Sequence, residues 1–171
     1  METSANADGF YFSVRSTRPV LLTRVRVGLR DGTAPTTVRV AVRRGGAAKR
    51  PQATQADWAL WAAVGRATVE STDCVVDLAL PVPVAPHSDL CVHASGRRCA
   101  TTPSLAASPP TGVEICDCSA YSGAAPFFVE GGALVGGALC GGVDFDDCDE
   151  AAWREELAEF IRRRGDHFMS C

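Results

Sequence analysis

The sequence lacks the features that would place the chain in a membrane or direct it out of the cell. Its longest uncharged apolar stretch, residues 133–143, is interrupted by glycines and is far shorter than the roughly 20 residues that a membrane helix needs. The first nine residues are polar and acidic, whereas a secretory signal starts with positive charge followed by an apolar segment. We therefore expect a single-domain intracellular protein of 171 residues that has no membrane partner.

Motifs of common catalytic sites are also missing. The sequence contains no G-x-S-x-G turn for a nucleophilic serine and no glycine-rich phosphate-binding loop. The three histidines, His87, His93 and His167, lie in a proline-rich edge, a predicted strand and the tail, away from any recognisable nucleophile. We predict that the protein is not an enzyme, that no residue is catalytic, and that it needs no cofactor.

Metal-binding patterns are incomplete. Cys116 and Cys118 would place two thiols on one face of a strand, which is not the C-x2-C knuckle that presents two ligands to zinc. Residues 144–150 are rich in carboxylates but lack the glycine and the distal glutamate of a calcium loop, so they fit the start of a helix. We predict no metal site, and we expect most of the eight cysteines to be reduced, small apolar residues.

What the sequence does contain is the alternation of half-buried β-strands. Residues 21–29 and 37–43 each alternate apolar and polar side chains, and a short loop with glycine and proline joins them, which favours an antiparallel pair. Further runs of this kind recur up to residue 146, separated by turns. The fold class that we predict is mostly β, an antiparallel β-sandwich of jelly-roll type over residues 10–146, preceded by a flexible arm over residues 1–9.

The end of the chain changes to helical periodicity. Acidic residues precede the segment, arginines close it and Gly165 follows, which predicts an amphipathic α-helix within residues 147–165 and a tail over residues 166–171. One face carries an apolar stripe that must be buried, either on its own sandwich or on a second molecule. This contact stripe consists of Trp153, Leu157, Phe160 and Ile161.

Positive charge is concentrated at the front of the chain and negative charge at the back. Residues 9–66 hold 11 basic and two acidic residues, whereas the segment from residue 111 onward holds 12 acidic ones. If residues 21–29 and 37–43 pair, four arginines share one solvent-facing surface that could bind an anionic partner, such as the acidic half of a second copy. The alternative is an ordinary solvated sheet face, because GC-rich codons alone would raise the arginine content. This predicted basic face consists of Arg24, Arg26, Arg39 and Arg43.

The order of these segments resembles two groups of β-sandwich domains. Residues 10–14, 19–29 and 38–42 are similar to the opening of PHR-type domains, the modules of the PAM/Highwire/RPM-1 proteins. The chain looks equally like an uncharacterised jelly-roll domain of algae, oomycetes and other protists, through a tryptophan strand at Trp58 and strands at residues 115–118 and 137–140. The resemblance covers about residues 9–146 and implies a sandwich with a protein-interaction role, without assigning any functional residue. With the GC-rich composition, it suggests a protist or a large DNA virus of protists as the source, and a viral protein would act in the host cytoplasm or the virion.

Two functions follow from these observations. The first is a non-enzymatic protein-interaction or structural β-sandwich module, whose partner is a protein or a second copy of the chain. The second is a carbohydrate-binding jelly roll, which would hold a glycan against exposed aromatic rings. The candidate rings for that alternative are Tyr11, Trp58, Trp61 and Tyr121.

Overall fold

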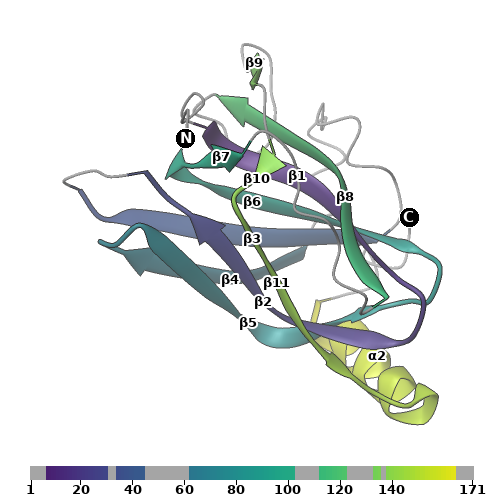
Figure 1. Ribbon diagram of the computed structural model, residues 1–171. Coiled ribbons are helices and arrows are strands. Elements are labelled where there is room, and N and C mark those ends of the chain that lie inside the picture. Colours follow the sequence, from purple (N-terminus) through teal and green to yellow (C-terminus); the bar gives the residue numbers. More distant parts are fainter. Residues whose placement is uncertain are drawn as a thin grey trace.

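The computed structural model describes residues 7–30, 34–44, 62–102, 112–122, 133–135 and 138–164. This part of the chain is mostly β-strand, arranged in antiparallel sheets with one C-terminal helix, which confirms the predicted fold class (Figure 1). The two main sheets pack face to face as a β-sandwich. The connectivity of a jelly roll stays a prediction.

The larger sheet contains six strands in the order β4-β3-β6-β1-β8-β9. The smaller sheet contains three, in the order β11-β2-β5, and β10 and β7 form a separate two-stranded ladder. The strands of the larger sheet are β1 (Ala7–Ser16), β3 (Thr36–Arg44), β4 (Ala62–Val69), β6 (Asp89–Cys99), β8 (Val113–Ser122) and β9 (Ala133–Val135). The others are β2 (Val20–Gly28), β5 (Asp73–Val84), β7 (Thr101–Thr102), β10 (Ala138–Leu139) and β11 (Gly141–Asp147).

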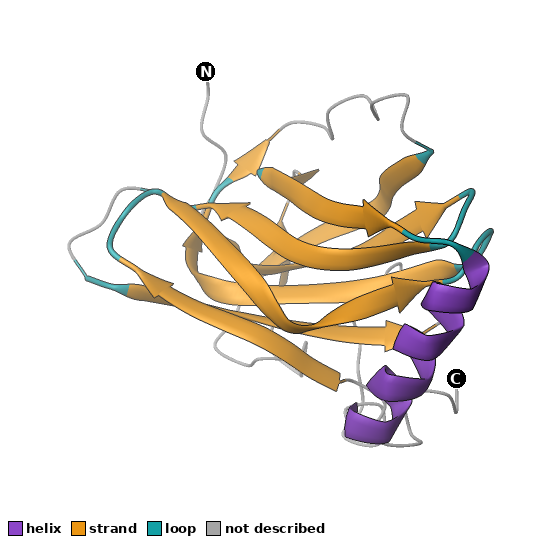
Figure 2. Cartoon of the chain, turned by 90° about the horizontal axis from the view of Figure 1, so that it is seen from below, coloured by secondary structure: helices purple, strands orange, loops and turns teal. Residues whose placement is uncertain are grey.

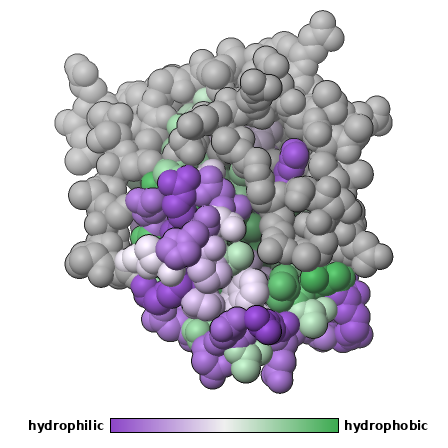
Figure 3. All heavy atoms as spheres, turned by 90° about the vertical axis from the view of Figure 1, so that its right-hand side faces the viewer, coloured by the Kyte–Doolittle hydropathy of each residue, from purple (hydrophilic) through white to green (hydrophobic). Residues whose placement is uncertain are grey.

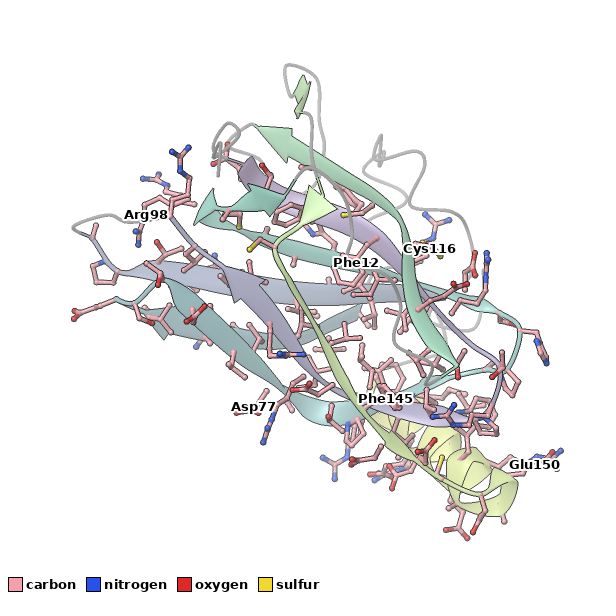
Figure 4. All side chains as sticks on the ribbon, viewed as in Figure 1. Phe12, Asp77, Arg98, Cys116, Phe145 and Glu150 are labelled. Atoms are coloured by element: carbon pink, nitrogen blue, oxygen red, sulfur yellow. The ribbon has the colours of Figure 1, made fainter. Side chains whose placement is uncertain are left out.

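The core lies between the two main sheets and follows from the alternation of the strands. Successive side chains of a strand point to opposite faces, so every second residue of β3 enters the core. In β2 the same alternation holds on either side of an irregularity between Leu22 and Arg24. Strand β1 lies at the centre of this packing, and its Phe12 is fully buried between the sheets (Figure 4). Valine predominates because its branched side chain packs well on a pleated surface. The core side chains of β2 and β3 are Val20, Leu22, Val25, Val27, Val38, Val40 and Val42.

The predicted pairing of residues 21–29 with residues 37–43 is wrong. Strand β2 pairs with β11 and β5 in the smaller sheet, whereas β3 pairs with β4 and β6 in the larger one. The chain therefore crosses from one sheet to the other after β2. As a result, the apolar faces of β2 and β3 belong to opposite sheets and both turn toward the core.

The helix α2 (Glu150–Arg164) lies at one end of the sandwich and packs against β5 (Figure 2). Asp149 caps its first turn, because its Oδ1 accepts a hydrogen bond of 2.7 Å from the backbone N–H of Ala152. Phe160 is fully buried and Trp153 is 9% exposed. The stripe thus contacts its own sandwich, while the surface at this end is mainly hydrophilic, with a smaller group of hydrophobic residues (Figure 3).

Candidate binding site

A hollow of about 600 Å³ lies on the outer face of the larger sheet, over β4, β3 and β6. The valines of β3 point toward the core, so Arg39 and Ala41, which alternate with them, lie on the outer face of the sheet. Strand β5 closes one side, with its backbone carbonyl at Asp77 against Gly65 of β4. We call this feature the outer hollow. Its lining includes Arg39, Ala41, Ala63, Gly65, Arg66, Asp77, Ala79, His93 and Ser95.

Two cross-strand rows form the base of the outer hollow. In the first row, Arg39 lies opposite Arg66 of β4 on one side and opposite Ser95 of β6 on the other. In the second row, Ala41 lies between Ala63 and His93. The short side chains of Ala41 and Ala63 leave open space above the second row, whereas the long side chains of Arg39 and Arg66 extend from the first row.

A bulge in β4 brings these residues into the same rows. Val40 lies opposite Gly65 and Ala41 opposite Ala63, so Val64 is an extra residue without a partner in β3. A bulge of this kind reverses the alternation on one strand only. Consequently Ala63 and Arg66 both lie on the outer face although they are three residues apart, while Val64 remains in the core.

The charges of the outer hollow are unbalanced. Among the residues that the structure describes, no carboxylate lies within ion-pair distance of Arg39 or Arg66. Asp77 is the acidic residue in the lining, and its Oδ1 already accepts a hydrogen bond of 2.6 Å from Nε of Arg24. Figure 4 shows Asp77 on β5, in the smaller sheet. The outer hollow therefore presents two exposed guanidinium groups that no described carboxylate neutralises.

Several arginines elsewhere on the sandwich are paired with carboxylates. Arg26 lies 3.2 Å from a carboxylate oxygen of Asp144, and Arg15 binds Asp89 at 2.7 Å. Because each of these charges is compensated locally, they attract a further anion less strongly than an unpaired arginine does.

The imidazole of His93 forms a buried wall of the outer hollow. It stacks on Tyr11 of β1 with ring centroids 4.5 Å apart, and it is 2% exposed. Burial disfavours the charged imidazolium and lowers the pKa of His93 to about 3. At neutral pH the side chain is therefore uncharged, so it can both donate and accept a hydrogen bond.

The predicted basic face does not exist as one surface. Arg39 and Arg43 lie on β3 in the larger sheet, whereas Arg24 and Arg26 lie on β2 in the smaller sheet. The prediction of a shared face was wrong because it depended on a pairing of β2 with β3. Arg66, Ser95 and His93 were not recognised as site residues. Arg66 and His93 lie in predicted strands, but the sequence of one strand does not indicate which residues of other strands lie opposite it.

The aromatic residues proposed for a glycan site do not form an exposed platform in the described part of the chain. Tyr11 is 2% exposed and stacks under His93, so the prediction that it contacts a sugar is wrong. Trp58 and Trp61 lie outside the described residues, and so does the side chain of Tyr121.

Cys116 and Cys118 lie on opposite faces of β8, contrary to the prediction that they share one. Cys116 lies opposite Ser13, whereas Cys118 packs against the core. The cause is a second bulge. Cys116 lies opposite Ser13 and Ser119 lies opposite Tyr11, so β8 has two residues between these pairs where β1 has only Phe12. Within the described ranges, no group of three or more metal-ligating side chains occurs.

No family model, curated protein or solved structure matches this chain. The resemblance to PHR-type and protist domains therefore stays a prediction. Among the described residues, no helix has the length and apolar character needed to cross a membrane.

Proposed function

We propose that this chain is a non-enzymatic interaction module that binds its partner in the outer hollow. The observation that carries this proposal is the unbalanced charge of the hollow, where Arg39 and Arg66 stand opposite each other and no described carboxylate lies within ion-pair distance of either. Like charges directly across an antiparallel pair destabilise a sheet, so the presence of this pair at a concave site favours a role in binding.

A binding role also agrees with the chemistry of the hollow. At neutral pH His93 is an uncharged imidazole, which makes it a poor general acid, and burial restricts its access to a substrate. Ala41 and Ala63 offer space without reactive groups. The sandwich supplies a rigid base, because three hydrogen-bonded strands fix the relative positions of the lining residues.

Site-specific crosslinking tests this proposal. A photoreactive amino acid is placed at Ala63, in the hollow, and at Val75, which is 45% exposed on the smaller sheet. Irradiation in a lysate of the source cells should give a discrete adduct from position 63 that is absent from position 75. Ala63→Trp, which places a large ring in the hollow, should prevent capture of the same partner by a crosslinker placed at Thr68, farther along β4. Identical adducts from positions 63 and 75, or capture that persists in Ala63→Trp, would refute the proposal.

A further inference from the structure

Arg39 and Arg66, which have no ion-pair partner among the described residues, are close enough to hold one anion together. Residues directly opposite each other on antiparallel strands have Cβ atoms about 5 Å apart, and Arg39 and Arg66 are such a pair. Each guanidinium offers several N–H donors in a planar fork that suits carboxylate and phosphate oxygens. An anion between them would receive hydrogen bonds from both sides and relieve the repulsion of the two cations.

The neighbouring groups in the described strands do not compensate these charges. On one side, the hydroxyls of Thr37 and Thr68 hydrogen-bond to each other at 2.7 Å, and on the other side lie the two alanines. Next to Arg39 in the same row, Ser95 of β6 adds a hydroxyl that can donate a hydrogen bond. Three potential donors thus lie side by side on β4, β3 and β6.

The charge of this site matches a dianion better than a monoanion. A carboxylate carries one negative charge and would leave one guanidinium uncompensated, whereas a phosphate monoester carries about −1.5 to −2 near neutral pH. Its three free oxygens can also accept hydrogen bonds from several donors at once. The volume above Ala41 and Ala63 and beside uncharged His93 leaves room for the organic group that the phosphate carries.

We infer that the outer hollow binds a phosphate monoester, with the phosphate between Arg39 and Arg66 and the esterified group over Ala41. This inference rests on the proposed function, because it names the chemistry that the same hollow recognises. In an interaction module, a phosphorylated side chain of a partner protein is the source that we expect.

The test is a set of calorimetric titrations with defined probes. The full chain is titrated with a capped phosphoserine peptide, with glucose 6-phosphate and with dimethyl phosphate. Dimethyl phosphate is the matched control, because it is a phosphate ester with a single charge. Arg39→Gln and Arg66→Gln remove one guanidinium each, and Arg26→Gln is the control variant on the smaller sheet, where the arginine is paired with Asp144. Circular dichroism melts of all variants show that they remain folded.

We expect the phosphoserine peptide to bind and dimethyl phosphate to bind at least about tenfold more weakly. Arg39→Gln and Arg66→Gln should each weaken binding of the peptide by about tenfold or more, and Arg26→Gln should leave it unchanged. Binding should also weaken as the pH falls below about 6, where the phosphate loses its second charge. Glucose 6-phosphate binding as tightly as the peptide would support the phosphate site and identify a small ester as its source.

Absence of binding by both phosphate monoesters, or affinity that persists in both arginine variants, would overturn the inference. If position 63 still crosslinks a partner in that case, the interaction module remains and only its ligand chemistry is wrong. If instead phosphate monoesters bind through both arginines but positions 63 and 75 give identical adducts, the anion site remains and the proposed protein interaction fails.

Discussion

Buried His93 should make the stability of this protein depend on pH below neutrality. In the folded protein, burial lowers the pKa of His93 to about 3, compared with about 6.5 for a solvated histidine. Between these values, the unfolded chain binds a proton that the folded protein excludes. The contribution of His93 to stability is therefore fully present above about pH 6.5 and is lost as the pH falls toward 3.

The magnitude follows from this difference in pKa. Each pH unit between the two pKa values changes the free energy of unfolding by about 1.4 kcal/mol. Between about pH 7.5 and about pH 4.5, the excluded proton should remove about 3 kcal/mol of stability. A domain of this size has a net stability of about 5–15 kcal/mol, so the loss is large enough to measure.

The assay is urea unfolding at both pH values for the wild-type protein and for His93→Phe. Phenylalanine keeps an aromatic ring against Tyr11 but cannot be protonated, and acidic groups common to both proteins cancel in the comparison. Exposed His87 provides the control variant His87→Gln, which should lose as much stability on acidification as the wild type. If His93→Phe also loses as much as the wild type, the imidazole does not exclude the proton and the reasoning is refuted.

Three further perturbations test the packing. Gly141→Ala should destabilise the protein by at least about 2 kcal/mol in urea unfolding, because φ is 149° and a Cβ would collide with the backbone carbonyl of Arg26. Gly142→Ala, where a Cβ meets only the flexible end of the Arg26 side chain, should change stability by less than about 1 kcal/mol, and equal losses would contradict the geometry. Phe160→Ala should lower the free energy of unfolding by about 3–5 kcal/mol in the same assay, because removal of a fully buried ring leaves a cavity between α2 and the sandwich. A loss below about 1 kcal/mol would show that the packing of the helix does not depend on this ring. In the folded protein, Cys99 should resist a thiol reagent until the chain unfolds, since burial raises the pKa of its thiol to about 12, and rapid labelling located by mass spectrometry would disprove this.

Much of the fold could be predicted from local patterns. The alternation of Val38, Val40 and Val42 correctly identified the buried face of β3, and the helical spacing of Trp153 and Phe160 identified the buried stripe of α2. These predictions succeed because side-chain direction repeats every two residues in a strand and every 3.6 in a helix, whatever lies opposite. The partner of each strand could not be predicted in the same way, since similar valine alternations fit many pairings.

The outer hollow depends on two such pairings at once, that of β3 with β4 and that of β3 with β6. Its first row joins positions 39, 66 and 95, which become neighbours only when β3 lies between β4 and β6. The bulge at Val64 then determines which side chains of β4 lie on the outer face. The sequence of a single strand does not indicate where such a bulge occurs.

Local sequence patterns are sufficient to predict the valine-rich strands with one buried face and the amphipathic helix at the end of the chain. These are properties of neighbouring residues and need no long-range contact. Only the tertiary structure decided that β2 and β3 belong to different sheets, that Arg24 is paired with Asp77, and that Arg39 faces Arg66. Those outcomes depend on contacts between residues far apart in the chain, because the net charge and shape of a surface are set by whichever strands the fold brings together.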